Sequence, residues 1–261
     1  MPNHRPIAFV LASTHTGAML VNRNDYNVVP SGTYGVGHQI LTTSSYDQGE
    51  VDLALKLLAE RHKHFGSGVF AIDCGANIGV HTIAWAKVMD SWGEVLAIEA
   101  QERIFYALAG NLTLNNCFNA QAKWAAIGES LGEILVPELN PTRPASFGSL
   151  ELREMSVPEK IGQPRDQLRR IPIKMLSIDS LAKERVDLIK IDVEGMELEA
   201  LRGACLTIQR CLPNLIIEKI KSDEPSIIRM LNPLGYRFFQ FGINLVAVHK
   251  ADPSINILPR G

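Results

Sequence analysis

The sequence predicts an α/β protein built on a mainly parallel, Rossmann-like sheet, and two observations carry this prediction. Between about residue 50 and residue 220, short apolar runs alternate with longer segments whose apolar residues recur at helical spacing. This β–α–β order favours a parallel sheet covered on both faces. Near the end, "YRFFQF" and "LVAVHK" flank "GIN", which predicts an antiparallel hairpin at the edge of that sheet.

The composition of residues 1–48 predicts a short β-rich extension made of strands and turns. "IAFVLAS" and "AMLVNR" have strand composition and are separated by "THTG", and "NVVPSGTYGVGHQ" is rich in turn residues. Residues 49–261 are expected to form the main domain.

The main domain begins with "EVDLALKLLAERHKHF", an amphipathic helix that places Leu53, Leu57, Leu58 and Phe65 on one face. Further helices are expected in "HTIAWAKVM", "RIFYALAGNLTLN" and "MELEALRGACLTIQRCL". Strands are expected in "VFAID", "EVLAIEA", "AKWAAIG", "VDLIKID" and "NLIIEKI".

Composition restricts the class of protein. The chain has 261 residues, of which 46% are hydrophobic and 21% charged, and its net charge is −2. Such a balance disfavours bulk nucleic-acid binding. The four cysteines lack metal-ligand spacing, and the early run "PIAFVLA" is too short for a secretory signal or a membrane span. A cytoplasmic protein without a membrane span is expected, and nothing in the sequence predicts its oligomeric state.

The segment "AIDCGANIGVHT" predicts a ligand site after the first central strand. Parallel sheets bind ligands at the carboxyl ends of their strands. Gly75 and Gly79 would let backbone approach a ligand closely, and the next helix offers free N–H groups. Asp73 and Asn77 suit a ligand with an ammonium group and no phosphate, and His81 lies close to this turn. The alternative is a glycine turn that serves helix packing alone.

The second strand, "VLAIEA", ends in Glu99, about twenty residues beyond the glycines. An acid at this position can accept hydrogen bonds from both ribose hydroxyls of an adenosine. Together the two signals indicate S-adenosylmethionine, with its amino-acid part over the first turn and its ribose on Glu99. Ala125 and Ala126 would then lie near the adenine.

The segment "KIDVEGME" supplies candidates for chemistry. Lys190 interrupts an apolar strand, Asp192 and Glu194 follow it, and Glu218 ends the next strand, "LIIE". These acids could stabilise a helix start through its dipole, which explains Glu197 better than Asp192 or Glu218. Paired carboxylates could instead bind a divalent ion through oxygen or act as a base. Asp192, Glu194 and Glu218 are therefore candidates for either role.

The chain resembles the FkbM-type methyltransferases, which use S-adenosylmethionine. The resemblance is carried by "IDCGANIGVHT", "LAIEA", "NLTLNN", "LSIDSL" and "VDLIKIDVEGMELEALRGA", in that order, and covers roughly residues 50–249. The family usually has Pro after the ribose acid, where this chain has Ala100. The N-terminal extension and much of the insert at 139–172 lie outside the resemblance.

The resemblance implies a Rossmann-like methyltransferase domain and methyl transfer, typically to a hydroxyl oxygen. The acceptor would be a small molecule or a glycan. An alcohol loses its proton as it attacks the methyl, so a base or a metal such as Mg²⁺ or Mn²⁺ is expected nearby. Two alternatives stay open: an RNA (ribose) methyltransferase, and a binding protein that keeps the nucleoside pocket without catalysis.

Overall fold

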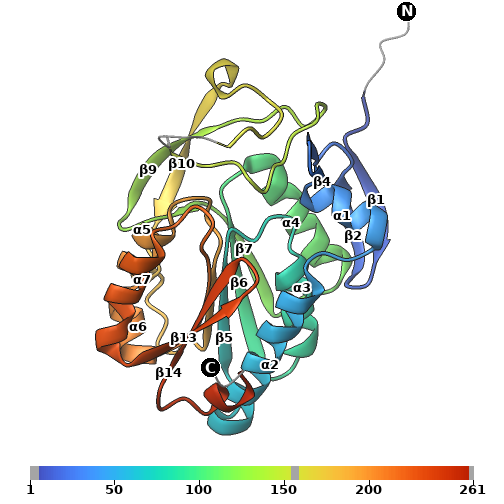
Figure 1. Ribbon diagram of the computed structural model, residues 1–261. Helices are drawn as coiled ribbons and strands as arrows, with labels where there is room; N and C mark the ends of the chain where they lie inside the picture. Colours follow the sequence, from blue (N-terminus) through green and yellow to red (C-terminus); the bar gives the residue numbers. More distant parts are fainter. Residues whose placement is uncertain (1–5, 154–158, 259–261) are drawn as a thin grey trace, which may run out of the picture.

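A computed structural model describes residues 6–153 and 159–258 (Figure 1), so residues 1–5 of the predicted extension, 154–158 of the insert and 259–261 lie outside this description. Its main sheet has seven strands in the order β13-β14-β12-β11-β5-β6-β7. The five parallel strands are β5 (Val69–Cys74), β6 (Gly93–Glu99), β7 (Ala120–Trp124), β11 (Leu188–Ile191) and β12 (Asn214–Glu218). The expected mainly parallel sheet is confirmed.

The C-terminal hairpin is also confirmed. β13 (Tyr236–Phe241) and β14 (Asn244–His249) pair antiparallel, and β14 pairs antiparallel with β12. The hairpin therefore extends the sheet at one edge, beside the acid that ends β12.

Helices cover both faces of the sheet, as Figure 1 shows. α2 (Gln48–Phe65), α3 (Val80–Val88) and α4 (Glu102–Leu114) pack on one face, and α5 (Glu197–Arg202), α6 (Cys205–Cys211) and α7 (Glu224–Leu231) lie on the other. Every residue of β5, β11 and β12 is buried, as expected for strands covered on both faces. None of the helices that the structure describes is long and apolar enough to cross a bilayer.

The register brings polar residues together at the carboxyl ends of the strands. Asp73 in β5 lies beside Ala97 in β6 on one side and Lys190 in β11 on the other. Glu99 and Glu218 are the last residues of β6 and β12. Four neighbouring strands therefore deliver ionisable side chains to one edge of the sheet.

The N-terminal extension differs in part from the prediction. The hairpins β1 (Phe9–Thr14) with β2 (Gly17–Asn22) and β3 (Asn27–Val29) with β4 (Gly32–Tyr34) are present, but a helix, α1 (Val36–Thr43), follows them. Its start is held by Asp25, whose Oδ2 accepts a hydrogen bond from the Gly37 N–H at 3.0 Å. A cap supplied from twelve residues away leaves little local signal, so expecting only strands and turns here was wrong.

Two further expectations need correction. "AKWAAIG" is divided between β7 in the main sheet and β8 (Ala126–Ile127), which joins β9 (Gly132–Pro137) and β10 (Arg170–Leu176) in a separate small sheet. The predicted helix "MELEALRGACLTIQRCL" is two helices, α5 and α6. They separate at Gly203, because the Asp179 side chain accepts hydrogen bonds from the Leu206 and Thr207 N–H groups and so starts α6 afresh.

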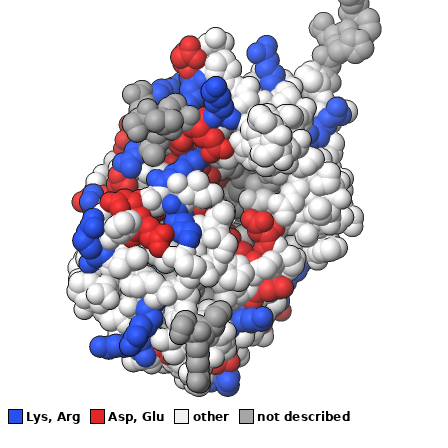
Figure 2. Space-filling view, viewed as in Figure 1, with Lys and Arg blue, Asp and Glu red and all other residues white. Residues whose placement is uncertain are grey.

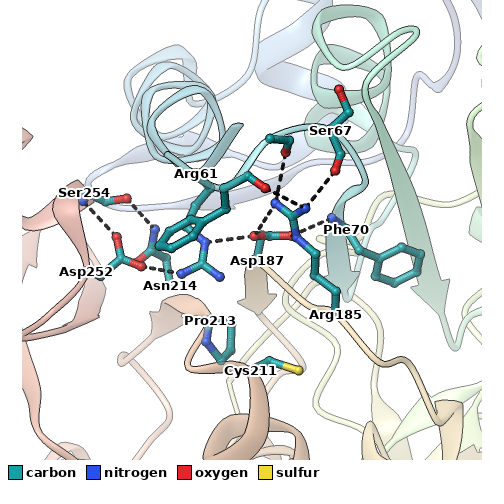
Figure 3. A network of polar contacts seen from close by, with 12 residues as sticks. Arg61, Ser67, Phe70, Arg185, Asp187, Cys211, Pro213, Asn214, Asp252 and Ser254 are labelled. Carbon is teal, nitrogen blue, oxygen red and sulfur yellow. Dashed lines mark hydrogen bonds and ion pairs between the residues drawn. The ribbon is translucent and has the colours of Figure 1, made fainter. Parts of the chain in front are cut away.

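A network of buried charges joins the amino ends of the strands to α2 (Figure 3). Asp187, directly before β11, accepts hydrogen bonds from the Phe70 N–H at 2.9 Å and from the guanidinium groups of Arg61 and Arg185. Arg61 also pairs with Asp252, which follows β14. Arg185 donates in addition to the Ser67 carbonyl at 2.8 Å. Two acids are thus matched by two arginines and backbone groups, which fixes this end of the sheet.

Candidate active site

A cavity of about 420 Å³ opens at the carboxyl ends of the parallel strands. Its floor is the ends of β5, β6, β11 and β12, and its walls come from three regions that are far apart in the sequence. These are the N-terminal extension with Tyr34 and Val36, the start of α2 with Glu50, and the insert with Ser146 and Leu150. The extension and the insert therefore lie against the same cavity as the strand ends.

The turn after β5 lines the cavity. The Asp73 side chain is 1% exposed, and its Oδ2 accepts a hydrogen bond from Thr82 Oγ1 at 2.6 Å. Its Oδ1 has no hydrogen-bond partner within the described part of the chain. Gly75 has a φ of 77°, and a Cβ there would lie 1.7 Å from the Asp192 carbonyl oxygen. Only glycine therefore allows this turn to lie against the end of β11.

Glu99 connects the two central turns. Its Oε2 accepts a hydrogen bond from the Asn77 N–H at 3.0 Å, and its Oε1 accepts one from the Gln101 N–H at 2.7 Å. Burial raises the pKa of Glu99 to about 7, although these backbone hydrogen bonds act in the opposite direction. Ala125 and Ala126 line the cavity next to it. Each carboxylate oxygen retains capacity for a further donor.

The two remaining residues of the predicted turn have different positions. Gly79 does not line the cavity; it precedes α3 with a φ of 93°, and a Cβ there would lie 2.6 Å from Leu108 Cδ1. The structure therefore supports a packing role for Gly79. His81 does line the cavity, and its Nε2 lies 3.3 Å from Glu50 Oε1.

Three acids meet at the ends of β11 and β12. Asp192, Glu194 and Glu218 each place a carboxylate oxygen within 4.8 Å of the others. Burial and the charge of Asp192 raise the pKa of Glu194 to about 9 and that of Glu218 to about 8. Glu218 Oε2 is buried and has no hydrogen-bond partner among the described residues. Such a cluster can hold a proton or a divalent cation.

Two lysines border this cluster. Lys190 Nζ donates to Asp192 Oδ2 at 2.9 Å and lies 4.0 Å from Glu50 Oε1. Burial alone would lower the pKa of Lys190, but the charges of Asp192, Glu50 and Asp73 outweigh it and raise the pKa well above its usual value. Lys190 is therefore held as a cation.

Sequence reasoning missed Lys221, which follows β12. Its Nζ lies 2.5 Å from Glu194 Oε2, 2.8 Å from Glu159 Oε2 and 2.9 Å from the Ser149 carbonyl oxygen. It therefore ties the insert to the acid cluster. Its position three residues after a strand-ending acid was the available signal, but its partners in the insert could not be located without the fold.

The chain is similar to known methyltransferases. A family model described as the methyltransferase FkbM domain matches residues 73–238. "Methyltransferase 1" of Beauveria bassiana is 25% identical over 200 residues, covering 72% of this chain and 77% of its own length. "Methyltransferase sdnD" of Sordaria araneosa is 25% identical over 185 residues, covering 62% of this chain and 70% of its own.

A solved structure also matches. It is described as methyltransferase FkbM from Methylobacillus flagellatus KT, with 19% identity and a TM-score of 0.48. The match covers 72% of this chain, and the chain spans about half, 47%, of that protein.

Proposed function

Because the chain belongs to the FkbM methyltransferase family, we propose that this methyltransferase moves the methyl group of S-adenosylmethionine to a hydroxyl oxygen on a small molecule or a glycan. The observation that supports this most is the pair of carboxylates at neighbouring strand ends. Asp73 and Glu99 both line one cavity, and each has acceptor capacity that the described chain does not use.

These residues fit the cofactor that the family implies. The Glu99 carboxylate would accept hydrogen bonds from both ribose hydroxyls. The backbone N–H groups of Asn77 and Gln101 hold this carboxylate in place. Asp73 Oδ1, which has no partner in the described chain, would accept a hydrogen bond from the ammonium group. Gly75, His81, Ala125 and Ala126 would complete the wall around the cofactor. When bound, S-adenosylmethionine supplies an activated methyl group on a sulfonium.

The acid cluster would receive the proton of the acceptor hydroxyl. Asp192 and Glu218 lie within reach of one another at the ends of β11, which pairs with β5, and of β12, which pairs with β11. Positioning and proton removal there would both favour attack. Lys190 would keep Asp192 oriented. The same carboxylates, with Glu194, would hold Mg²⁺ or Mn²⁺ if the reaction is metal-assisted.

The cavity's charge argues against the other two functions. Eight acidic side chains line it, which suits a sulfonium and repels the phosphates of RNA. A binding protein without catalysis would not need the Asp192, Glu194 and Glu218 cluster.

We also propose that residues 1–48 and 49–261 act as an extension and a catalytic domain of a cytoplasmic protein. The four cysteines are free thiols, as a reducing compartment would keep them.

Calorimetric titration of S-adenosylhomocysteine tests the cofactor assignment. Glu99→Ala should weaken binding by about 1–3 kcal/mol, the cost of losing hydrogen bonds to a charged group. Glu94→Ala is the matched control, because Glu94 lies at the exposed start of the same strand. Unchanged affinity in a folded Glu99→Ala protein would refute the assignment.

Adding a chelator separates the two ways of removing the proton. Methyl transfer from labelled cofactor that stops with chelator and returns with Mg²⁺ or Mn²⁺ would establish metal assistance. Transfer that continues unchanged would assign the proton to a side chain of the cluster.

A further inference from the structure

We propose that the acceptor is an uncharged hydroxyl compound with an apolar portion, and that Ile220 and Ile243 are the residues that select it. This inference rests on the proposed methyl transfer and adds the class of acceptor. Three features of the cavity support it: the sign of its charge, the engagement of its lysines, and the apolar side chains at its mouth.

The cavity lining is strongly acidic. Among the described residues that line it are eight acids and two lysines. Figure 2 shows acidic side chains gathering in the middle of the drawn face, while the surface over β1, β2 and α1 carries few charges. The acids are Asp47, Glu50, Asp73, Glu99, Glu159, Asp192, Glu194 and Glu218. Burial raises the pKa values of Glu99, Glu194 and Glu218 to about 7, 9 and 8, but without these three the other five acids still outnumber the two lysines. An anionic acceptor would have to enter this negative field, which opposes its binding.

Neither lysine is available to neutralise an anion. Lys190 is hydrogen-bonded to Asp192, and Lys221 is paired with both Glu194 and Glu159. A phosphate at either ammonium would have to displace a carboxylate that is already in place. The lysines are therefore occupied by acids of the cavity itself, of which they compensate only a part.

The basic residues of the insert do not serve the cavity either. Arg165, Arg169 and Arg170, and Lys174 just after the insert, are absent from its lining. Arg165 instead pairs with Glu151 at 2.6 Å, within the insert. A phosphate-bearing sugar or lipid, which these residues would suit if they faced the site, is therefore disfavoured.

The mouth of the cavity carries exposed apolar side chains. Ile220 follows β12 and is 62% exposed; Ile243 lies in the β13–β14 turn and is 45% exposed. Both line the cavity. The Lys219 N–H donates to the Ile243 carbonyl at 3.0 Å, which holds the two segments together. Apolar side chains beside an acidic interior suit an acceptor that places its hydroxyl inside and its apolar part at the mouth.

Matched glucosides test this proposal by calorimetry on the complex with S-adenosylhomocysteine. The probes are octyl glucoside below its micelle-forming concentration, methyl glucoside and glucose phosphate. Octyl glucoside should bind about tenfold or more tightly than methyl glucoside, because its chain is buried at the mouth. Glucose phosphate should bind no more tightly than methyl glucoside.

The double variant Ile220→Ser/Ile243→Ser should abolish the preference for the octyl chain. Leu11→Ser/Val28→Ser is the control, because both residues are exposed and neither lines the cavity. Tighter binding of glucose phosphate, equal binding of the two glucosides, or a preference that survives in the cavity variant would overturn the proposal. Failure of S-adenosylhomocysteine to bind at all would instead refute the proposed methyl transfer.

Discussion

Buried charges lie at both ends of the parallel strands, and the two ends are arranged in opposite ways. At the amino ends, Asp187 and Asp252 share the guanidinium group of Arg61, and Asp187 also accepts hydrogen bonds from Arg185 and the Phe70 N–H. At the carboxyl ends, acids outnumber lysines, and Asp73 and Glu218 each keep a carboxylate oxygen without a partner in the described chain.

The difference distinguishes charges that support the fold from charges that are available to a ligand. A buried charge without a partner is costly, so a charge network that only supports the fold is expected to be balanced, as it is at the amino ends. At the carboxyl ends, burial and, after it, the charge of Asp192 raise the pKa values of Glu194 and Glu218. Such an imbalance is expected where a ligand completes the site.

The largest effect, on methyl transfer, is expected from Asp192→Asn. This substitution removes one charge at the carboxyl ends of the strands and nearly keeps the shape of the side chain. Methyl transfer should fall by roughly 10²–10⁴, the range for loss of a general base, while S-adenosylhomocysteine binds as before. Labelled-methyl assays and calorimetry measure the two quantities. Asp90→Asn, at an exposed position after α3, should change neither. A variant that turns over normally would show that Asp192 serves only the local fold.

The balanced end should respond in stability instead. Arg61→Met leaves Asp187 and Asp252 without their shared guanidinium, so the free energy of unfolding should fall by about 3–5 kcal/mol. Urea titration followed by circular dichroism measures this change. Arg202→Met is the control: Arg202 pairs with Glu129 on the surface, where an ion pair contributes about 0–1 kcal/mol. Equal losses in the two variants would contradict the importance of the network.

Glu218→Gln tests the stability of the carboxyl ends. It removes a buried ionisable group that burial makes harder to ionise, with a pKa raised to about 8, and whose Oε2 has no partner in the described chain. The free energy of unfolding should therefore stay the same or rise at neutral pH. A loss as large as that expected for Arg61→Met would mean that the two ends do not differ in kind.

The smallest effect on ligand binding concerns pH. Because burial raises the pKa of Glu99 to about 7, part of its carboxyl population is protonated near neutral pH. The ribose hydroxyls are bound best by the ionised form, so binding releases a proton and tightens as pH rises. Affinity for S-adenosylhomocysteine should increase by up to about tenfold from pH ~6 to pH ~8 and then level off. Glu99→Gln should bind weakly without this dependence; a wild-type affinity that falls over this interval would contradict it.

The floor of the cavity could be predicted because each of its residues lies at or next to the end of a strand. Asp73, Glu99, Asp192 and Glu218 each lie at or just beyond the end of a buried apolar run, and parallel strands bring such ends together. The one departure was Gly79, which packs against Leu108 instead of lining the cavity. A glycine's sequence position does not distinguish close approach to a ligand from close approach to a side chain.

The walls could not be predicted because they depend on contacts between distant segments. Lys221 meets Glu159 and Ser149, more than sixty residues away in sequence. The start of α1 is held by Asp25, which accepts a hydrogen bond from the Gly37 N–H. The Asp25 carboxylate also accepts a hydrogen bond from the Phe147 N–H at 3.0 Å. Such contacts follow from the fold of the extension and the insert, for which the sequence offers no periodic pattern.

A crystal structure of the complex with S-adenosylhomocysteine tests the central claim most directly. The ribose hydroxyls should lie about 3 Å from the Glu99 carboxylate, and the ammonium about 3 Å from Asp73 Oδ1. The sulfur should then face Asp192 and Glu218. Density for the ligand outside this cavity, or a ligand inside it that contacts neither Asp73 nor Glu99, would contradict the assignment of the carboxyl ends as the methyl-transfer site.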